Sequence, residues 1–376
     1  MNSNWWFILY NVVIWFVCFG ITRNNATDFY KKGGAIVHPQ RSIIFIYLLF
    51  LFQALFIFYG GDDARYEKEV TESATFVGQD YNIAMGLESL YYYIAALVGG
   101  NYILWKMVVY GGALILTYLT SLNIKSNNFL FLYSFVLFVL ANFGSSRNAL
   151  AIAIFVYGIS LIKINRKISV ILGIAISALS IFAHNSMILP VVLLFVSFFK
   201  IKKSRFFILL LAIPLFVFIV NKIPDFLFMR TEIMESHLGN RVEAYDDASG
   251  NMAYRTSVFN NLYDILNYIA VATFLFYSLR MDNRRNLPLS LSVIIRVSFF
   301  IAYSAIIILL SDLSIKGTLF YRYILLILPI LYVVLPTLFL DKEILKNKKI
   351  KTVEYPAVVL NFEFMVMLIY YGFMGS

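Results

Sequence analysis

Two ionisable residues in strongly apolar surroundings are the first candidates for chemistry in this chain. Arg147 opens an apolar segment after Gly144-Ser145-Ser146, and His184 stands in Ala183-His184-Asn185-Ser186. Arginine can bind a phosphate or carboxylate through two parallel hydrogen bonds, and histidine can exchange a proton near neutral pH. A simpler interpretation of each is also open: an arginine that extends to the membrane surface, and a turn histidine satisfied by the backbone.

Further ionisable residues suggest the same kind of site. Arg322 lies in Phe320-Tyr321-Arg322-Tyr323 at the start of another apolar segment, where it could bind an anion or form an ion pair with Asp312 or Glu88. The adjacent carboxylates Asp62 and Asp63 could hold a divalent cation, but neighbouring side chains on an extended chain diverge. We therefore expect no metal site.

The elements that position these residues are predicted to be transmembrane helices. Of 376 residues, 61% are hydrophobic and 14% charged, and long apolar runs recur from residue 4 to residue 374. A bilayer core of roughly 30 Å needs about 20 helical residues. The runs are apolar on all sides, whereas barrel strands alternate. We expect an all-α, polytopic membrane bundle of about 12 transmembrane helices, with a range of about 11 to 13. The predicted helices lie near 4–20, 42–60, 101–120, 129–143, 148–162, 168–184, 187–199, 206–222, 259–279, 290–311, 318–340 and 355–374.

The loop charges predict the orientation of this single transmembrane domain, residues 1–376. Basic residues gather near 23–41, 125, 163–167, 200–205, 280–285 and 342–351, and acidic ones in 62–80 and 225–247. By the positive-inside rule the basic loops face the cytoplasm and the acidic loops face outward. The net charge of +10 thus reflects topology, and without a continuous basic face no nucleic-acid partner is expected.

Three segments are predicted not to cross the bilayer as ordinary helices. Residues 61–100 are expected to form an outer loop followed by an interfacial or re-entrant helix, and residues 223–258 a large, amphipathic outer (periplasmic) loop. The 32 apolar residues 168–199 would span about 48 Å as one helix, which is too long for one crossing and short for two. The chain is therefore predicted to turn near His184.

Several short motifs follow one another in a fixed order along the chain. They are Gly61-Asp62-Asp63-Ala64-Arg65-Tyr66, Glu88, Ser146-Arg147-Asn148-Ala149-Leu150-Ala151-Ile152-Ala153, Ala183-His184-Asn185-Ser186 and Tyr321-Arg322-Tyr323 before Pro329. This ordered set resembles the EpsG family of Wzy-like polysaccharide polymerases. The resemblance implies a multi-pass enzyme of the bacterial inner (cytoplasmic) membrane that joins undecaprenyl-pyrophosphate-linked oligosaccharide repeat units on the outer face. A GT-C-like arrangement of the helices is one form that such a bundle could take.

The resemblance also suggests a role for each candidate. Arg147 and Arg322 would hold the donor pyrophosphate, and His184 or an outer carboxylate would deprotonate the acceptor hydroxyl. The carboxylates Asp62, Asp63 and Glu88 would orient sugar hydroxyls. Substrate binding would also involve Arg230, Arg241, Arg255 and Tyr66. Since the pyrophosphate leaving group supplies the driving force, and no glycine-rich phosphate loop is present, no cofactor is expected.

Other functions compete with a polymerase. A lipid-linked oligosaccharide flippase or another transporter would also carry charges inside the membrane, although the only midplane candidates are Glu363, Arg296 and Lys106. An O-antigen ligase-like transferase would use the same donor, and a membrane acyltransferase or a scaffold are weaker rivals. Besides the bilayer and the lipid-linked glycan, a chain-length regulator and a flippase are candidate partners.

Overall fold

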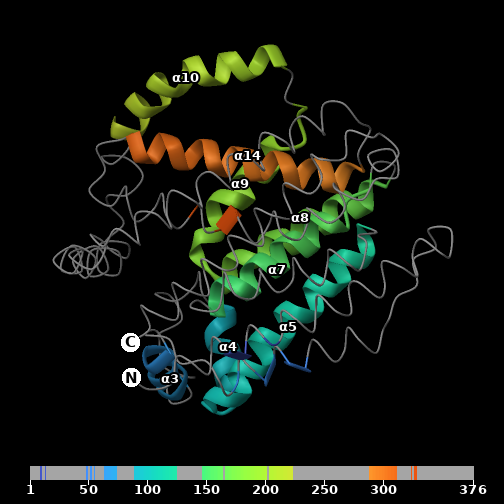
Figure 1. Ribbon diagram of the computed structural model, residues 1–376, viewed down its shortest axis with the longest axis vertical. Helices are drawn as coiled ribbons and strands as arrows, with labels where there is room; N and C mark the ends of the chain where they lie inside the picture. Colours follow the sequence, from blue (N-terminus) through green and yellow to red (C-terminus); the bar gives the residue numbers. More distant parts are fainter. Residues whose placement is uncertain are drawn as a thin grey trace.

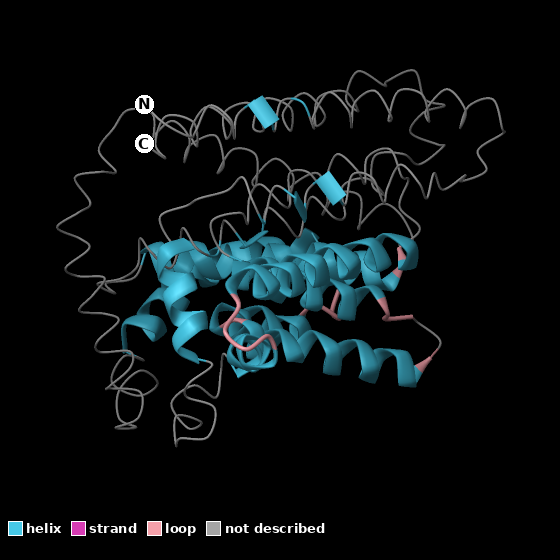
Figure 2. Cartoon of the chain, turned by 90° about the horizontal axis from the view of Figure 1, so that it is seen from below, coloured by secondary structure: helices cyan, strands magenta, loops and turns pink. Residues whose placement is uncertain are grey.

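The described part of the protein consists of helices and a few short turns. The computed structural model describes residues 63–73, 89–124, 146–163, 166–200, 203–222 and 288–310, with a few single positions near residues 10, 50 and 325. Within these ranges there is no strand (Figure 2). The helices are α3 (Asp63–Ser73), α4 (Ser89–Leu97), α5 (Tyr102–Asn123), α7 (Ser146–Ser160), α8 (Lys167–Ala183), the 3-10 turn η2 (Asn185–Met187), α9 (Ile188–Val196), α10 (Lys203–Lys222) and α14 (Leu289–Leu310).

The helical fold class is confirmed for this part of the chain. Helices α5 and α14 have 22 residues each, and both are long and apolar enough to cross a membrane. Helices α7, α8 and α10 also coincide with predicted segments. The predicted helices 129–143, 259–279 and 355–374 lie outside the described residues, and 4–20, 42–60 and 318–340 contribute only single helical positions.

Helix α14 packs against three of the other described helices. It contacts α7, α9 and α10, and α9 crosses it near its middle in Figure 1. Every residue from Ser290 to Ser298 is buried, so this part of the helix has no exposed face. Tyr303 ties α14 to α10, because its hydroxyl donates to the carbonyl oxygen of Leu209 at 2.6 Å. A helix buried on all sides needs no amphipathic stripe, which agrees with its largely apolar sequence and scattered polar residues.

Small residues allow α7 and α8 to pack with almost no side chain between them. On α8 the buried positions are Gly173, Ser177, Ser180 and Ala183. A Cβ atom added to Gly158 of α7 would lie 2.5 Å from the backbone nitrogen of Ser177 and 2.6 Å from the carbonyl oxygen of Gly173. Such close approach is typical of helices packed in membranes, where small residues bring backbones together. The glycine and serine positions therefore bring the two backbones into direct contact.

Two glycines redirect the chain between α4 and α5. Gly99 and Gly100 have φ angles of 61° and 74°, a left-handed conformation that residues with a Cβ atom adopt only at a cost. The Gly100 N–H donates to the carbonyl oxygen of Ala95 at 2.9 Å and so closes the end of α4. Asn101 then caps α5, because its side-chain oxygen accepts from the Leu104 N–H at 3.1 Å. Helix α4 has only nine residues, fewer than a bilayer crossing requires.

The turn predicted near His184 is confirmed. Helix α8 ends at Ala183, the 3-10 turn Asn185–Met187 follows, and α9 begins at Ile188. Pro190 stands in the first turn of α9, where its missing N–H breaks no helical hydrogen bond. The depth of this turn in the bilayer stays a prediction.

Candidate functional site

His184 lies where α8 ends and the 3-10 turn begins. Its backbone is extended, with φ −158° and ψ 131°, and its N–H donates to the carbonyl oxygen of Ser180 at 3.0 Å. The Ser186 N–H donates to the Nδ1 atom of His184 at 3.2 Å, and the Met187 N–H donates to its carbonyl oxygen at 3.1 Å. The simpler interpretation, a turn histidine satisfied by backbone, therefore holds for Nδ1. The imidazole is partly exposed.

The start of α7 lies against this turn. The Ser186 hydroxyl donates to the side-chain oxygen of Asn148 at 3.5 Å, and the turn packs against α7. Met187 is fully buried there. Asn148 directly follows Arg147, the second residue of α7. Arg147 and His184 are 37 positions apart in the sequence, but the segments that carry them are in contact. The structure describes the backbone of Arg147 but not its side chain.

Helices α3 and α4 also come to this end of α7. Helix α4 packs against α3, α5 and α8. Leu150, one helical turn beyond Arg147, belongs to the same buried cluster as Tyr91 of α4 and Trp105 of α5. Asp63 is the first residue of α3, which packs on this cluster through Tyr66 and Val70. Helices α3, α4, α5 and α7 therefore all contribute to this buried cluster.

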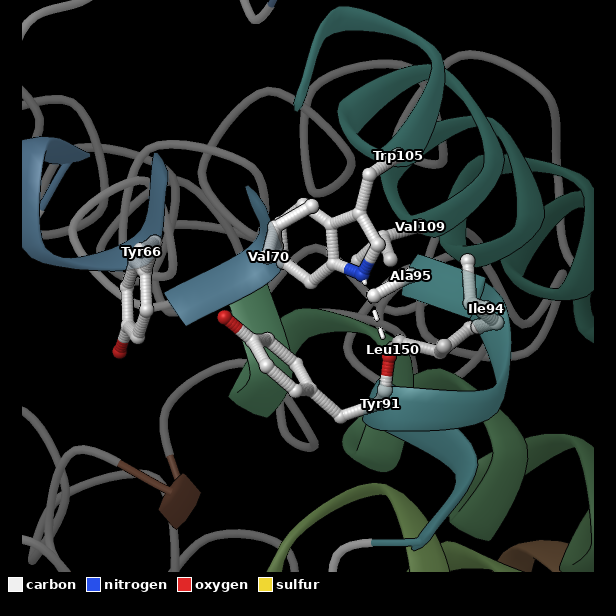
Figure 3. Packing of buried hydrophobic residues seen from close by; sticks show 8 residues of the cluster. All are labelled: Tyr66, Val70, Tyr91, Ile94, Ala95, Trp105, Val109 and Leu150. Carbon is white, nitrogen blue, oxygen red and sulfur yellow. Dashed lines mark hydrogen bonds between the residues drawn. The ribbon is translucent and has the colours of Figure 1, made fainter. Parts of the chain in front are cut away.

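Tyr66 packs inside an aromatic cluster, defined here by Tyr66, Tyr91, Tyr102 and Trp105. It is 5% exposed, and its ring centroid lies 6.2 Å from that of Tyr91 and 6.5 Å from that of Trp105. The rings of Tyr91 and Trp105 meet edge to face at 4.8 Å, and the indole N–H donates to the Tyr91 carbonyl oxygen at 3.4 Å (Figure 3). Tyr66 fixes α3 to α4 and α5, and its assignment to substrate binding stays a prediction.

Two cations inside apolar helices are buried, and the sequence reading did not assign them to the site. Lys106 is 3% exposed, and its Nζ atom lies 4.8 Å from the centroid of the Tyr102 ring, a distance suited to a cation–π interaction. Arg296 is 5% exposed, and its Nη1 atom donates to the carbonyl oxygens of Ser197 and Phe198 at 3.4 and 3.3 Å. These oxygens end α9, where a cation complements the helix dipole. Arg296 thereby holds α9 against α14. The sequence signal that could have identified Lys106 and Arg296 is a charged residue within an apolar run.

The remaining site predictions lie outside the described residues. They are Asp62, Glu88, Arg230, Arg241, Arg255, Arg322 and the loop 223–258. Among the residues that the structure does describe, no group of three or more histidine, cysteine, aspartate or glutamate side chains could hold a metal ion. The arrangement that can be seen therefore consists of a helix start with an arginine and a turn with a histidine, beside a cluster of aromatic rings.

Comparison with known proteins gives one match. The model of a family described as the EpsG family matches residues 39–375, nearly the whole chain. No curated protein and no solved structure matches the chain.

Proposed function

Because the chain belongs to the EpsG family, which is associated with Wzy-like polysaccharide polymerases, we propose that it joins lipid-linked oligosaccharide repeat units. The family and the apolar helices make it a membrane protein of the polysaccharide-polymerase type. The finer assignment is that its substrates are oligosaccharides on undecaprenyl pyrophosphate, and that transfer occurs on the outer face of the bacterial cytoplasmic membrane. This assignment uses about 12 transmembrane helices, oriented by the basic and acidic loops.

The reaction that we propose is a glycosyl transfer between two lipid-linked chains. An oxygen of the acceptor sugar attacks the anomeric carbon of the donor, and the bond from that carbon to the pyrophosphate oxygen breaks. Undecaprenyl pyrophosphate leaves with the electron pair, and a base takes the hydroxyl proton. Arg147 and Arg322 would stabilise the charge that develops on the leaving group. Asp62, Asp63, Glu88 and His184 are the candidates for the base.

One contact between residues of this chain supports the proposal. The Asn148 and Ser186 side chains approach to 3.5 Å, so the segment of Arg147 lies against the turn of His184. A pyrophosphate-leaving reaction needs a fixed cation and a proton-handling group within reach of one substrate. Arg230, Arg241 and Arg255 of the outer loop would then bind the sugar chain or the second pyrophosphate. The lipid bilayer supplies both substrates by lateral diffusion, and a flippase and a chain-length regulator would act before and after this step.

The test is polymerisation by the purified protein in nanodiscs, with a synthetic undecaprenyl-pyrophosphate repeat unit of the native host and no nucleotide. Wild type should produce a ladder of products on a gel or in a mass spectrum, and Arg147→Ala and His184→Ala should lose it. A loss of about 100-fold or more is expected where a group stabilises transition-state charge. Arg166→Ala is the matched control, because Arg166 is an exposed arginine at the opposite end of α8 and caps that helix with no side-chain hydrogen bond.

The alternative outcomes separate the competing functions. If wild type gives no ladder but moves the same lipid across a vesicle bilayer, the protein is a flippase. If it transfers one preformed chain to a lipid acceptor without lengthening it, the protein is a ligase. Either result would contradict the polymerase proposal.

A further inference from the structure

The hydrogen bond to His184 determines which ring nitrogen carries the proton. The Ser186 N–H donates to Nδ1 at 3.2 Å, so Nδ1 must present a lone pair. A neutral imidazole has one accepting and one donating nitrogen. With Nδ1 as acceptor, Nε2 bears the hydrogen and can only donate. A doubly protonated ring would instead set an Nδ1–H against the Ser186 N–H, two donors facing each other.

The Nδ1 atom of His184 also has a structural role. Helix α8 ends where the His184 N–H donates to the carbonyl oxygen of Ser180. A new turn begins at Asn185, and the first N–H groups of such a turn have no carbonyl partner in a preceding helical turn. An extended residue whose side chain accepts from the N–H two positions later is the usual geometry of a helix N-cap. Here Nδ1 performs the capping that an aspartate or serine oxygen more often provides. Taking a proton on Nδ1 would break this cap.

These contacts argue against His184 as the base of the proposed reaction. A base must offer a lone pair to the acceptor hydroxyl, and the lone pair of this ring is used by Ser186. The Nε2–H group suits an oxygen that gains negative charge. The turn touches the residue that follows Arg147, and the pyrophosphate proposed to bind at Arg147 offers oxygens of this kind.

We propose that His184 is an Nε2–H hydrogen-bond donor to a pyrophosphate oxygen of the lipid-linked substrate, and that the base is a carboxylate. This inference rests on the proposed function for the identity of its ligand. Donation to the leaving group would strengthen as the glycosyl bond breaks and charge moves onto the pyrophosphate, and such donors stabilise the transition state more than the ground state.

The tautomer can be measured without turnover. The chain has three histidines, His38, His184 and His237, so protein labelled with ¹⁵N in the imidazole ring and reconstituted in lipid should give few resonances in solid-state NMR. The His184 signals are those missing from His184→Gln protein. We expect an unprotonated Nδ1 and a protonated Nε2 at neutral pH, and an Nε2–H resonance that shifts when undecaprenyl pyrophosphate is added. A protonated Nδ1, or an Nε2–H resonance unchanged at saturating lipid, overturns the proposal.

Three substitutions at one position separate a donor from a base in the polymerisation assay. In His184→Gln the amide nitrogen can take the place of Nε2–H, whereas His184→Asn keeps an oxygen near Nδ1 and loses the donor. His184→Ala loses both. A donor role predicts that Gln retains most of the rate, while Asn and Ala lose about 100-fold or more. A base role predicts equal losses for all three, since no amide takes a proton, and this result would overturn the inference.

Two controls keep the outcomes apart. Ser186→Ala removes the hydroxyl but keeps the backbone N–H, so the His184 tautomer should not change. The thermal midpoints should fall in Gln and Ala but less in Asn, because Asn alone can still cap the turn. A wild-type protein that shows the expected tautomer and lipid shift but makes no polymer would contradict the proposed function and still support His184 as a pyrophosphate donor.

Discussion

At the crossing of α7 and α8 two backbones almost touch, whereas at the start of α5 large aromatic rings fill the space between helices. In the first region a glycine of α7 faces a glycine and a serine of α8, and no atom could be added between them. In the second, Trp105 and Val70 are fully buried among the rings of Tyr66 and Tyr91. Both regions are tightly packed, the first with small residues and the second with large ones.

The difference follows from what surrounds each region. Between helices within a bilayer there is no hydrophobic driving force, because lipid tails are as apolar as the side chains, so close backbone approach and interhelical hydrogen bonds stabilise the pair. Helix α3 is polar, with Glu67, Lys68 and Glu72 exposed, so it must be held by burying a few large apolar groups away from water. The two regions should therefore respond differently to the loss and to the gain of atoms.

The largest effect should come from removing atoms from the aromatic cluster. Trp105→Ala deletes a side chain that is 0% exposed, together with the hydrogen bond to Tyr91. Core truncations of this kind destabilise by about 3 to 5 kcal/mol. A clearly lowered thermal midpoint in detergent, followed by circular dichroism, would be the readout. Met107→Ala on the exposed face of α5 is the control and should change stability by about 0.5 kcal/mol or less. Equal midpoints for the two variants would show that the cluster does not hold these helices.

Adding one methyl group should have the next largest effect, but only at the crossing. Gly158→Ala places a Cβ atom 2.5 Å from the Ser177 backbone nitrogen, so α7 and α8 must move apart. Overpacking of this kind costs about 1 to 3 kcal/mol. Gly111→Ala on α5 is the matched control, since nothing lies within 4 Å of its added Cβ atom. That variant should be neutral or more stable by up to about 1 kcal/mol through helix propensity. A Gly158→Ala protein as stable as Gly111→Ala would contradict the backbone contact.

The α4–α5 turn should respond to backbone strain and not to crowding. Gly99 has φ 61°, and an added Cβ atom would meet nothing within 4 Å, so Gly99→Ala tests conformation alone. We expect a loss of about 1 to 2 kcal/mol in the same thermal measurement. Gly99→Asn should lose less, because asparagine tolerates the left-handed conformation. Identical losses for Ala and Asn would point to a different role for this glycine.

The smallest effect should come from the interhelical hydrogen bond at the crossing. The Ser177 hydroxyl donates to the carbonyl oxygen of Phe155 at 3.0 Å between two fully buried residues. Ser177→Ala keeps the close packing and removes only this bond, and such bonds within membranes are worth about 0.6 kcal/mol on average. A loss as large as that of Gly158→Ala would mean that the hydrogen bond, and not the small size of these residues, holds α7 to α8.

Prediction from the sequence succeeded where one local property decides the structure. Long apolar runs predicted α5 and α14, because the length of a span is set by the bilayer. The turn at His184 followed from a stretch too long for one helix. Each of these features depends on residues near one another in the chain.

The sequence also contained the residue types of the candidate site, but not their partners. Tyr66 stood in a motif assigned to substrate binding, and the structure packs it against Tyr91 and Trp105. Arg296 was visible as a charge in an apolar run, yet the carbonyl oxygens that it binds are 99 and 98 residues away. The few polar residues of α14 do not form a stripe that would reveal which face meets which neighbour.

Residue type and helix length were thus readable from the chain alone, because they depend on side-chain chemistry and on membrane thickness. The contact of the Arg147 segment with the His184 turn required α7 and α8 to cross at a particular depth and rotation, which depends on packing between distant residues. The protonated nitrogen of His184 was decided by one backbone N–H two residues on, in a turn whose geometry exists only after both helices have formed. From that geometry we infer that His184 is a hydrogen-bond donor and not the base.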